Sequence, residues 1–364
     1  MSICSVVVRV LSVLAVLCPH ILQDIGAKYF GYWFPWCELG LCVRNMRLFK
    51  LYSKVHGRMK KLLRILITLM AVLVLAFLIG PKPDQPEYFN DLPVLATPFE
   101  AIEDSIYNFE SQHNALECAY TEVFWTDSLR QTDYSFLYLH GFSATKHEGD
   151  FFRYLLPRKF GMNAVFNRMA GHGLQEIDSE RMSTFTAESA WYKALYDFSL
   201  AKRLGKKVVI GSCSTGSLLA LRLARLYPED VAAVLNYSPN MGLPDPNSAL
   251  LNGPWGLELI KAISGTEYRI VPERSDTIRI VCKPMAYSWE SVVQMQHLVE
   301  TAISEQELNE IKVPVLNMVW YEDEVHQDYV IDVAKAKAMH DAIDGPKKWV
   351  TTAAKEHVIV NHRL

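Results

Sequence analysis

The chain lacks a surplus of charge, internal repeats and low-complexity segments. Its 37 Lys and Arg residues nearly balance 40 Asp and Glu residues, which leaves a formal net charge of −3. A nucleic-acid partner requires a basic excess that neutralises phosphates, so this balance argues against one. The 364 residues, half of them hydrophobic, suffice for one large domain or two modest domains.

Paired cysteine motifs are missing as well. The seven cysteines are scattered without a C-x-x-C pair, and Cys37 and Cys42 in "CELGLC" have no His or Cys partner nearby. A zinc site needs such ligands grouped at short spacings. We therefore expect no metal site and interpret the cysteines as unpaired apolar residues.

A signal-peptide cleavage site is also lacking, although an apolar run extends from Ile65 to Gly80. No A-x-A-like sequence follows the run, and Pro81 stands where cleavage would have to occur. The run is preceded by the basic residues Arg58, Lys60, Lys61 and Arg64. These features favour an uncleaved membrane anchor at 59–80 over a removed signal or a buried core helix.

The charges around this run predict its orientation. Residues 44–64 carry eight Lys or Arg and no Asp or Glu, whereas the charges of residues 82–130 are mostly acidic. Basic flanks of membrane segments stay in the cytoplasm. The large C-terminal part is therefore expected on the extracytoplasmic side of the membrane.

Residues 1–58 have two interpretations. The stretch "SVVVRVLSVLAVLC" is either a second membrane segment, interrupted by Arg9, or part of an extension that is not normally translated. Because Met59 is followed by two lysines, as at the start of a signal or anchor sequence, we hypothesise that translation begins there. Peptides from residues 1–58 in mass spectra of the native protein would contradict this hypothesis.

From residue 81 onward, short β-rich runs alternate with helical stretches. Helices are predicted at 187–204, 215–227 and 328–343, and strands at 134–141, 163–169, 206–212, 231–238, 313–321 and 347–354. This alternation predicts a doubly wound, mostly parallel α/β sheet within residues 81–364. Residues 240–311 break the rhythm with helix-like pieces and no clear strand pair, and we expect them to form a lid over the strand ends.

The stretch "VVIGSCSTGS", residues 208–217, places three nucleophiles between a predicted strand and a predicted helix. A tight elbow of this kind needs small residues two positions before and two positions after the nucleophile. Ser214 has Ser212 and Gly216 there, whereas the other two choices would put a β-branched residue at one of these positions. The spacing favours Ser214, with Cys213 as the reserve nucleophile.

An acid and a histidine follow in the chain order that such an elbow requires. Asp323, in "YEDEVH", lies just past one predicted strand, and His357, in "EHVI", follows the last strand. We therefore predict that Asp323 orients His357 and that His357 activates Ser214. His362, close to the end of the sequence, is the alternative base.

His140 and Gly141 end the predicted strand at 134–141. The glycine lets the backbone turn, so that the Phe142 N–H and the Thr215 N–H can stabilise a developing oxyanion. We expect His140 to brace this loop rather than to react.

The segments "FLYLHGFSAT", "NRMAGHG", "IGSCSTGSLLAL", "YEDEVH" and "EHVI" together resemble the successive signature segments of α/β-hydrolases. The resemblance spans roughly residues 134–362 and is nearest to lidded esterases, lysophospholipases and monoacylglycerol lipases. It implies that Ser214, Asp323 and His357 form a catalytic triad and that no metal or organic cofactor is needed. The departures lie at the elbow, where Ser212 replaces the usual Gly and Cys213 replaces a frequent His.

The function expected from this resemblance is hydrolysis of an acyl ester through an acyl-enzyme. An apolar lid and a membrane anchor would suit acyl-chain substrates. Three alternatives stay open: a Cys213 hydrolase, a peptidase of the same fold, and a binding protein without catalysis.

Overall fold

The computed structural model describes residues 39–175, 182–271, 282, 284 and 286–361. The chain divides after Ala76 into two compact units. The possible second membrane segment near the N-terminus and the alternative base His362 lie outside the described residues.

The first unit is dominated by one helix, α3 (Leu39–Leu78), which runs through Met59 without a break. Its stretch Tyr52–Leu78 has 27 residues, a mean hydropathy of 2.4 and no buried part. At about 1.5 Å per residue it is about 40 Å long, which exceeds the ~30 Å hydrocarbon core of a bilayer. The helix therefore has the length and composition to cross a membrane.

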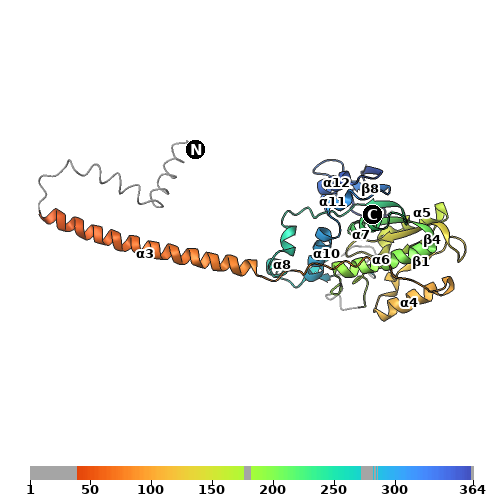
Figure 1. Cartoon of the computed structure of the whole chain (residues 1–364), viewed down its shortest axis with the longest axis horizontal. Coiled ribbons are helices and arrows are strands. Elements are labelled where there is room, and N and C mark those ends of the chain that lie inside the picture. Colours follow the sequence, from red (N-terminus) through yellow and green to blue (C-terminus); the bar gives the residue numbers. More distant parts are fainter. Residues whose placement is uncertain (1–38, 176–181, 272–281, 283, 285, 362–364) are drawn as a thin grey trace. The chain divides into compact units, whose positions relative to one another are not determined.

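A seven-stranded sheet forms the centre of the second unit (Figure 1). Its order is β1-β3-β2-β4-β5-β8-β9, and all neighbours are parallel except β1, which pairs antiparallel with β3. The strands are β1 (Glu122–Phe124), β2 (Thr132–Leu139), β3 (Asn163–Phe166), β4 (Gly205–Cys213), β5 (Val231–Tyr237), β8 (Val315–Trp320) and β9 (Lys347–Thr352). The six predicted strands are confirmed, whereas β1 is too short to show a period in the sequence.

Helices flank this sheet. Outside the segment between β5 and β8 they are η2 (Phe99–Ala101), α4 (Ile102–Gln112), η3 (Glu117–Ala119), η4 (Lys146–Gly149), α5 (Phe152–Phe160), α6 (Ala187–Leu204), α7 (Gly216–Leu226) and α12 (Val333–Ala342). The helix predicted at 328–343 begins only at Val333, because the Asp332 side chain caps it by accepting the Lys335 N–H. The residues before Asp332 are thereby left in a loop.

Alternation along the strands supplies an apolar surface to both faces of the sheet. On β2, Leu137 and Leu139 belong to one buried cluster, and Phe136 and Tyr138 belong to another. The first cluster includes residues of α6 and α7, and the second is packed against residues of α5. The sheet is therefore covered on both faces, as a doubly wound fold requires.

Between β5 and β8 the chain leaves the sheet and forms an insertion. Its elements are η6 (Ser248–Asn252), α8 (Gly256–Ser264), β6 (Tyr268–Ile270), β7 (Ala286–Ser288), α10 (Trp289–Thr301) and α11 (Glu305–Leu308). The antiparallel pair of β6 and β7 differs from the expectation of helical pieces alone, because each strand has only three residues. Tyr287 and Met295 of the insertion belong to the main buried cluster of the domain.

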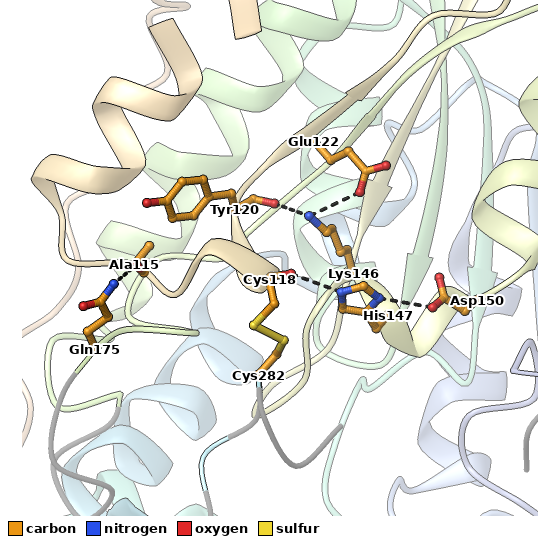
Figure 2. The surroundings of a disulfide bond; sticks show 9 residues. All are labelled: Ala115, Cys118, Tyr120, Glu122, Lys146, His147, Asp150, Gln175 and Cys282. Atoms are coloured by element: carbon orange, nitrogen blue, oxygen red, sulfur yellow. Dashed lines mark hydrogen bonds and ion pairs between the residues drawn. A yellow bond between two sulfur atoms is a disulfide. The ribbon is translucent and has the colours of Figure 1, made fainter. Parts of the chain in front are cut away.

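Cys118 and Cys282 form a disulfide (Figure 2), so the interpretation of all cysteines as unpaired is wrong. The two residues are 164 positions apart in the sequence, and only the folded chain brings them together. Cys118 lies in η3, and its carbonyl oxygen is 3.1 Å from Nε2 of His147 in η4. The disulfide therefore ties the insertion to the body of the domain next to η4.

We expect loss of this disulfide to lower the thermal stability of the domain. A crosslink over a loop of this length typically contributes about 2–4 kcal/mol, so Tm should fall by roughly 5–10 °C when the protein is reduced. The matched control is the double variant Cys118→Ser, Cys282→Ser, which should have the lower Tm with and without reductant. An unchanged Tm of the reduced wild type, measured by circular dichroism, would contradict this expectation.

Candidate active site

Ser214 stands in a strained turn between β4 and α7. Its φ is 52°, in the left-handed region that non-glycine residues rarely adopt. The Ser214 N–H donates to the Tyr237 carbonyl oxygen at 3.0 Å, which attaches the turn to the end of the neighbouring strand β5. The strand, the turn and the helix together make the elbow that the sequence predicts.

The small residues on either side of Ser214 are required by close packing. A Cβ at Gly216 would lie 2.3 Å from the Leu139 carbonyl oxygen, so only glycine fits there. The Ser212 side chain is buried, with its hydroxyl 2.6 Å from Asn236 Oδ1 and 3.0 Å from Ser217 Oγ. Ser212 therefore has a structural role beneath the elbow.

The three hydroxyl and thiol groups of the elbow differ in accessibility. Cys213 is fully buried among aromatic side chains of the sheet, including Phe136 and Tyr237. Ser214 retains 8% of its surface. Ser212 and Cys213 have no exposed surface, so of the three residues only Ser214 is exposed to any extent.

His357 is paired with Asp328 rather than with the predicted acid Asp323. His357 Nδ1 lies 2.7 Å from Asp328 Oδ2, and the Asp328 side chain is fully buried. The Val330 N–H also donates to Asp328 Oδ1 at 3.0 Å. The hydrogen bond between this carboxyl group and Nδ1 fixes the orientation of the imidazole and its tautomer.

The assignment of Asp323 is corrected by the path of the loop after β8. Tyr321 pairs with Gln327 across a tight turn, and the Asp328 N–H donates to the Trp320 carbonyl oxygen at 3.0 Å. The turn projects Asp323 into solvent and returns Asp328 to the end of the strand. In solvent, the hydrogen bond from His326 lowers the pKa of Asp323 to about 2.

The same part of the sheet edge positions His357 and Ser214. The Ser238 hydroxyl donates to the His357 carbonyl oxygen at 2.6 Å. Ser238 follows Tyr237, the residue that receives the Ser214 amide. Two successive residues at the end of β5 therefore hold the backbones of the nucleophile and of the histidine.

The loop after β2 approaches the elbow from the other side. A Cβ at Gly141 would lie 2.9 Å from the Ser214 Cβ, so this glycine permits the approach. Within the described part of the chain, neither the Phe142 N–H nor the Thr215 N–H donates to a protein acceptor. Thr215 follows Ser214 directly, and Phe142 follows Gly141, which packs against Ser214. Donors to an oxyanion formed at Ser214 must lie close to this residue.

Two buried histidines brace this loop. His140 Nε2 accepts the Met169 N–H at 2.9 Å, and His172 Nε2 accepts the Ser143 N–H at 3.0 Å. In both rings Nδ1 faces a carbonyl oxygen, Gly141 O for His140 and Ala170 O for His172, so each ring is neutral with its proton on Nδ1. The bracing role expected for His140 is shared by His172, for which the sequence predicts no role.

Further buried charges support these braces. Glu148 in η4 accepts the Gly141 N–H at 2.6 Å. Arg168 donates to the His172 carbonyl oxygen at 3.0 Å and to Glu110 at 2.5 Å. Burial raises the pKa of Glu110, but Lys193 and Arg168 outweigh this effect and leave it below the ordinary value.

The insertion contacts the same loop. The Phe142 and Tyr287 rings meet edge to face with centroids 5.3 Å apart, and Phe142 makes a similar contact with Phe185 at 5.3 Å. The insertion therefore provides an aromatic neighbour beside the elbow. Among the described residues, no group of three His, Cys, Asp or Glu side chains is arranged to hold a metal ion.

Comparisons with known proteins give a likeness of fold at low identity. No protein-family model matches the chain. No curated protein matches it either. A solved structure from the work on LipS and LipT, two metagenome-derived lipolytic enzymes, is 16% identical, with a TM-score of 0.54 over 67% of this chain and 91% of that chain. A monoacylglycerol lipase from Paleococcus ferrophilus is 17% identical, with a TM-score of 0.46 over 65% of this chain and 90% of that chain.

The first of these structures is matched over nearly its whole length. The strand order, the parallel pairing and the strand-turn-helix elbow agree with that likeness. The chain has the α/β-hydrolase fold.

Proposed function

We propose that the protein is a serine hydrolase that cleaves carboxylic acyl esters through an acyl-enzyme. The observation that carries the proposal is the left-handed Ser214 elbow together with the Asp328–His357 pair, both held at the end of β5 by the successive residues Tyr237 and Ser238. A serine becomes a nucleophile when a histidine removes its proton and an acid orients that histidine. Nucleophile, base and orienting acid are all carried by chain segments at one edge of the sheet.

In the proposed reaction, His357 Nε2 removes the Ser214 proton while its Nδ1–H donates to Asp328. Ser214 Oγ attacks the ester carbonyl carbon, and the resulting oxyanion accepts hydrogen bonds from the Phe142 and Thr215 amides. The intermediate collapses and expels the alcohol, which receives the proton from His357. Water then attacks the acyl-enzyme by the same route and releases the acid.

Acyl esters are favoured as substrates by the surroundings of the elbow. Phe142 and Tyr287 are apolar neighbours that suit an acyl chain better than a charged peptide. The LipS and LipT enzymes are described as lipolytic, which agrees with this choice. Cleavage of an amide by the same machinery is the second candidate within this class.

The two other sequence-based alternatives are less well supported. A Cys213 nucleophile would have to react from a fully buried position between the sheet's aromatic residues. A binding protein without catalysis would have no need for both a strained serine and a histidine oriented by a buried carboxylate. Each alternative predicts a different result in the labelling and activity measurements described next.

We also propose that residues 59–80 anchor the enzyme in a membrane with the hydrolase domain on the extracytoplasmic side. The apolar stretch of α3 and the basic residues before it support the anchor and its orientation. The Cys118–Cys282 disulfide supports the same side, because such bonds persist in oxidising compartments.

Replacement of Ser214 by Ala should abolish ester hydrolysis and labelling by a fluorophosphonate probe. We expect kcat to fall by at least about 10³-fold, since the nucleophile is lost while the oxyanion donors remain. Activity is measured with a series of p-nitrophenyl esters and labelling by in-gel fluorescence.

Cys213→Ala serves as the matched control at the elbow and should remain labelled on Ser214. Labelling that survives Ser214→Ala but disappears with Cys213→Ala would overturn the choice of nucleophile. Absence of turnover and of labelling in the wild type would favour a binding protein.

The two aspartates after β8 should respond differently to the same substitution. Asp328→Asn should lower kcat by about 10⁴-fold, because the amide cannot hold His357 in the required tautomer and stabilise its charged form. Asp323→Asn, the matched control on the exposed turn, should change kcat by less than about threefold, since exposed ion pairs contribute little. The reverse ranking in steady-state kinetics would restore Asp323 as the acid.

A further inference from the structure

Helix α8 carries an apolar stripe that the domain leaves uncovered. Leu259 and Ile263 are 44% and 73% exposed, and their spacing of four residues places them on one face; Trp255, the N-cap residue that precedes the helix, is 41% exposed. Leu250 of η6, 52% exposed, belongs to a segment whose backbone lies directly against Gly256. A cluster of large exposed apolar side chains on one helix marks an interaction surface.

The opposite side of α8 packs against the rest of the domain. Leu257 and Ile260 are partly buried, and α8 packs against α10 and η6. The helix's one basic residue, Lys261, forms ion pairs with Glu267 at 2.6 Å and Glu290 at 2.7 Å. Apolar residues therefore lie both on the side of α8 that packs against the domain and on the side that faces away from it, as in a helix with a second apolar partner.

The residues that follow the candidate membrane span contact Trp255, the N-cap residue of this helix. The Trp255 N–H donates to the Pro81 carbonyl oxygen at 2.8 Å. A Cβ at Gly80 would lie 1.9 Å from Trp255 Nε1, so the indole packs closely against the backbone at Gly80. All three residues belong to the second unit.

The short chain between α3 and Pro81 limits the distance between the end of α3 and the N-terminus of α8. Pro81 is three residues beyond Leu78, where α3 ends. Three residues extend at most about 10 Å, so the N-terminus of α8 stays within that order of distance from the end of the span. Where α3 spans a membrane, the chain length therefore keeps the N-terminus of α8 near the membrane surface.

We propose that the exposed face of α8, formed by Leu250, Trp255, Leu259 and Ile263, inserts into the headgroup and acyl boundary of the membrane that α3 spans. Trp is enriched at this boundary, and an amphipathic helix lies there with its apolar face toward the acyl chains. The inference rests on the proposed anchor. It also implies that the substrate, an acyl ester, enters the site from the bilayer beneath the insertion.

Photo-crosslinking of the full chain tests the contact directly. The protein is reconstituted in phosphatidylcholine and phosphatidylglycerol vesicles, with p-benzoylphenylalanine introduced at Ile263. The matched control carries the same group at Leu155, which lies on α5 and is 62% exposed. Figure 1 shows α5 well separated from α8 within the domain. Lipid adducts at position 263 and not at 155 are expected. Adducts to a second copy or another protein at 263, or equal lipid adducts at both positions, would overturn the proposal.

A second readout connects the contact to catalysis. Leu259→Asp should lower kcat/KM on a long-chain ester embedded in vesicles by about tenfold, because the apolar face no longer enters the boundary. Hydrolysis of soluble p-nitrophenyl butyrate should stay within about twofold of wild type, and Leu155→Asp should leave both activities unchanged. Equal losses on the two esters would overturn the link between docking and substrate entry. If the wild type hydrolyses neither ester, the proposed hydrolase function fails, while the crosslinks still decide the membrane contact.

Discussion

The close approach of β2 and β4 at their carboxyl ends is the constraint on which the site depends. The two strands are parallel neighbours, so the turn after β2 and the elbow after β4 meet at the same edge. Their contact is so tight that neither Gly141 nor Gly216 can carry a side chain without displacing the other segment. This packing holds Ser214 in its left-handed conformation and keeps the Phe142 and Thr215 amides beside it. The buried braces His140, His172 and Glu148 preserve the approach from the loop side.

Much of the fold could be predicted from the sequence because its signals are local. Continuous apolar runs mark the central strands, which are buried on both faces and therefore need apolar residues at every position. The register of the elbow was likewise readable from Ser212 and Gly216, since steric limits in a tight turn act over two residues. Helix α3 likewise follows from a long apolar run, whose length is sufficient to cross a bilayer.

The remaining features of the site depend on contacts between residues that are distant in the sequence or that lie in irregular loops. Asp323 and Asp328 both follow the same strand, and only the turn closed by Tyr321 and Gln327 determines which of them reaches His357. The Cys118–Cys282 disulfide joins residues that no local pattern relates. The role of His172 depends on a hydrogen bond to the loop after β2, 29 residues earlier. The sequence carries one signal for Asp328. Asp332 is a typical N-cap residue, and a helix that begins directly after it leaves Asp328 in the loop.

The proposed catalytic assembly of Ser214, His357, Asp328 and the two amides is tested most directly by a crystal structure of the protein after reaction with an alkyl fluorophosphonate. The proposed mechanism predicts phosphorus bonded to Ser214 Oγ, with one phosphonyl oxygen within about 3.2 Å of both the Phe142 and Thr215 nitrogens. His357 should remain paired with Asp328 in that adduct. Phosphorus on another residue, or a phosphonyl oxygen directed away from both amides, would contradict the proposed mechanism.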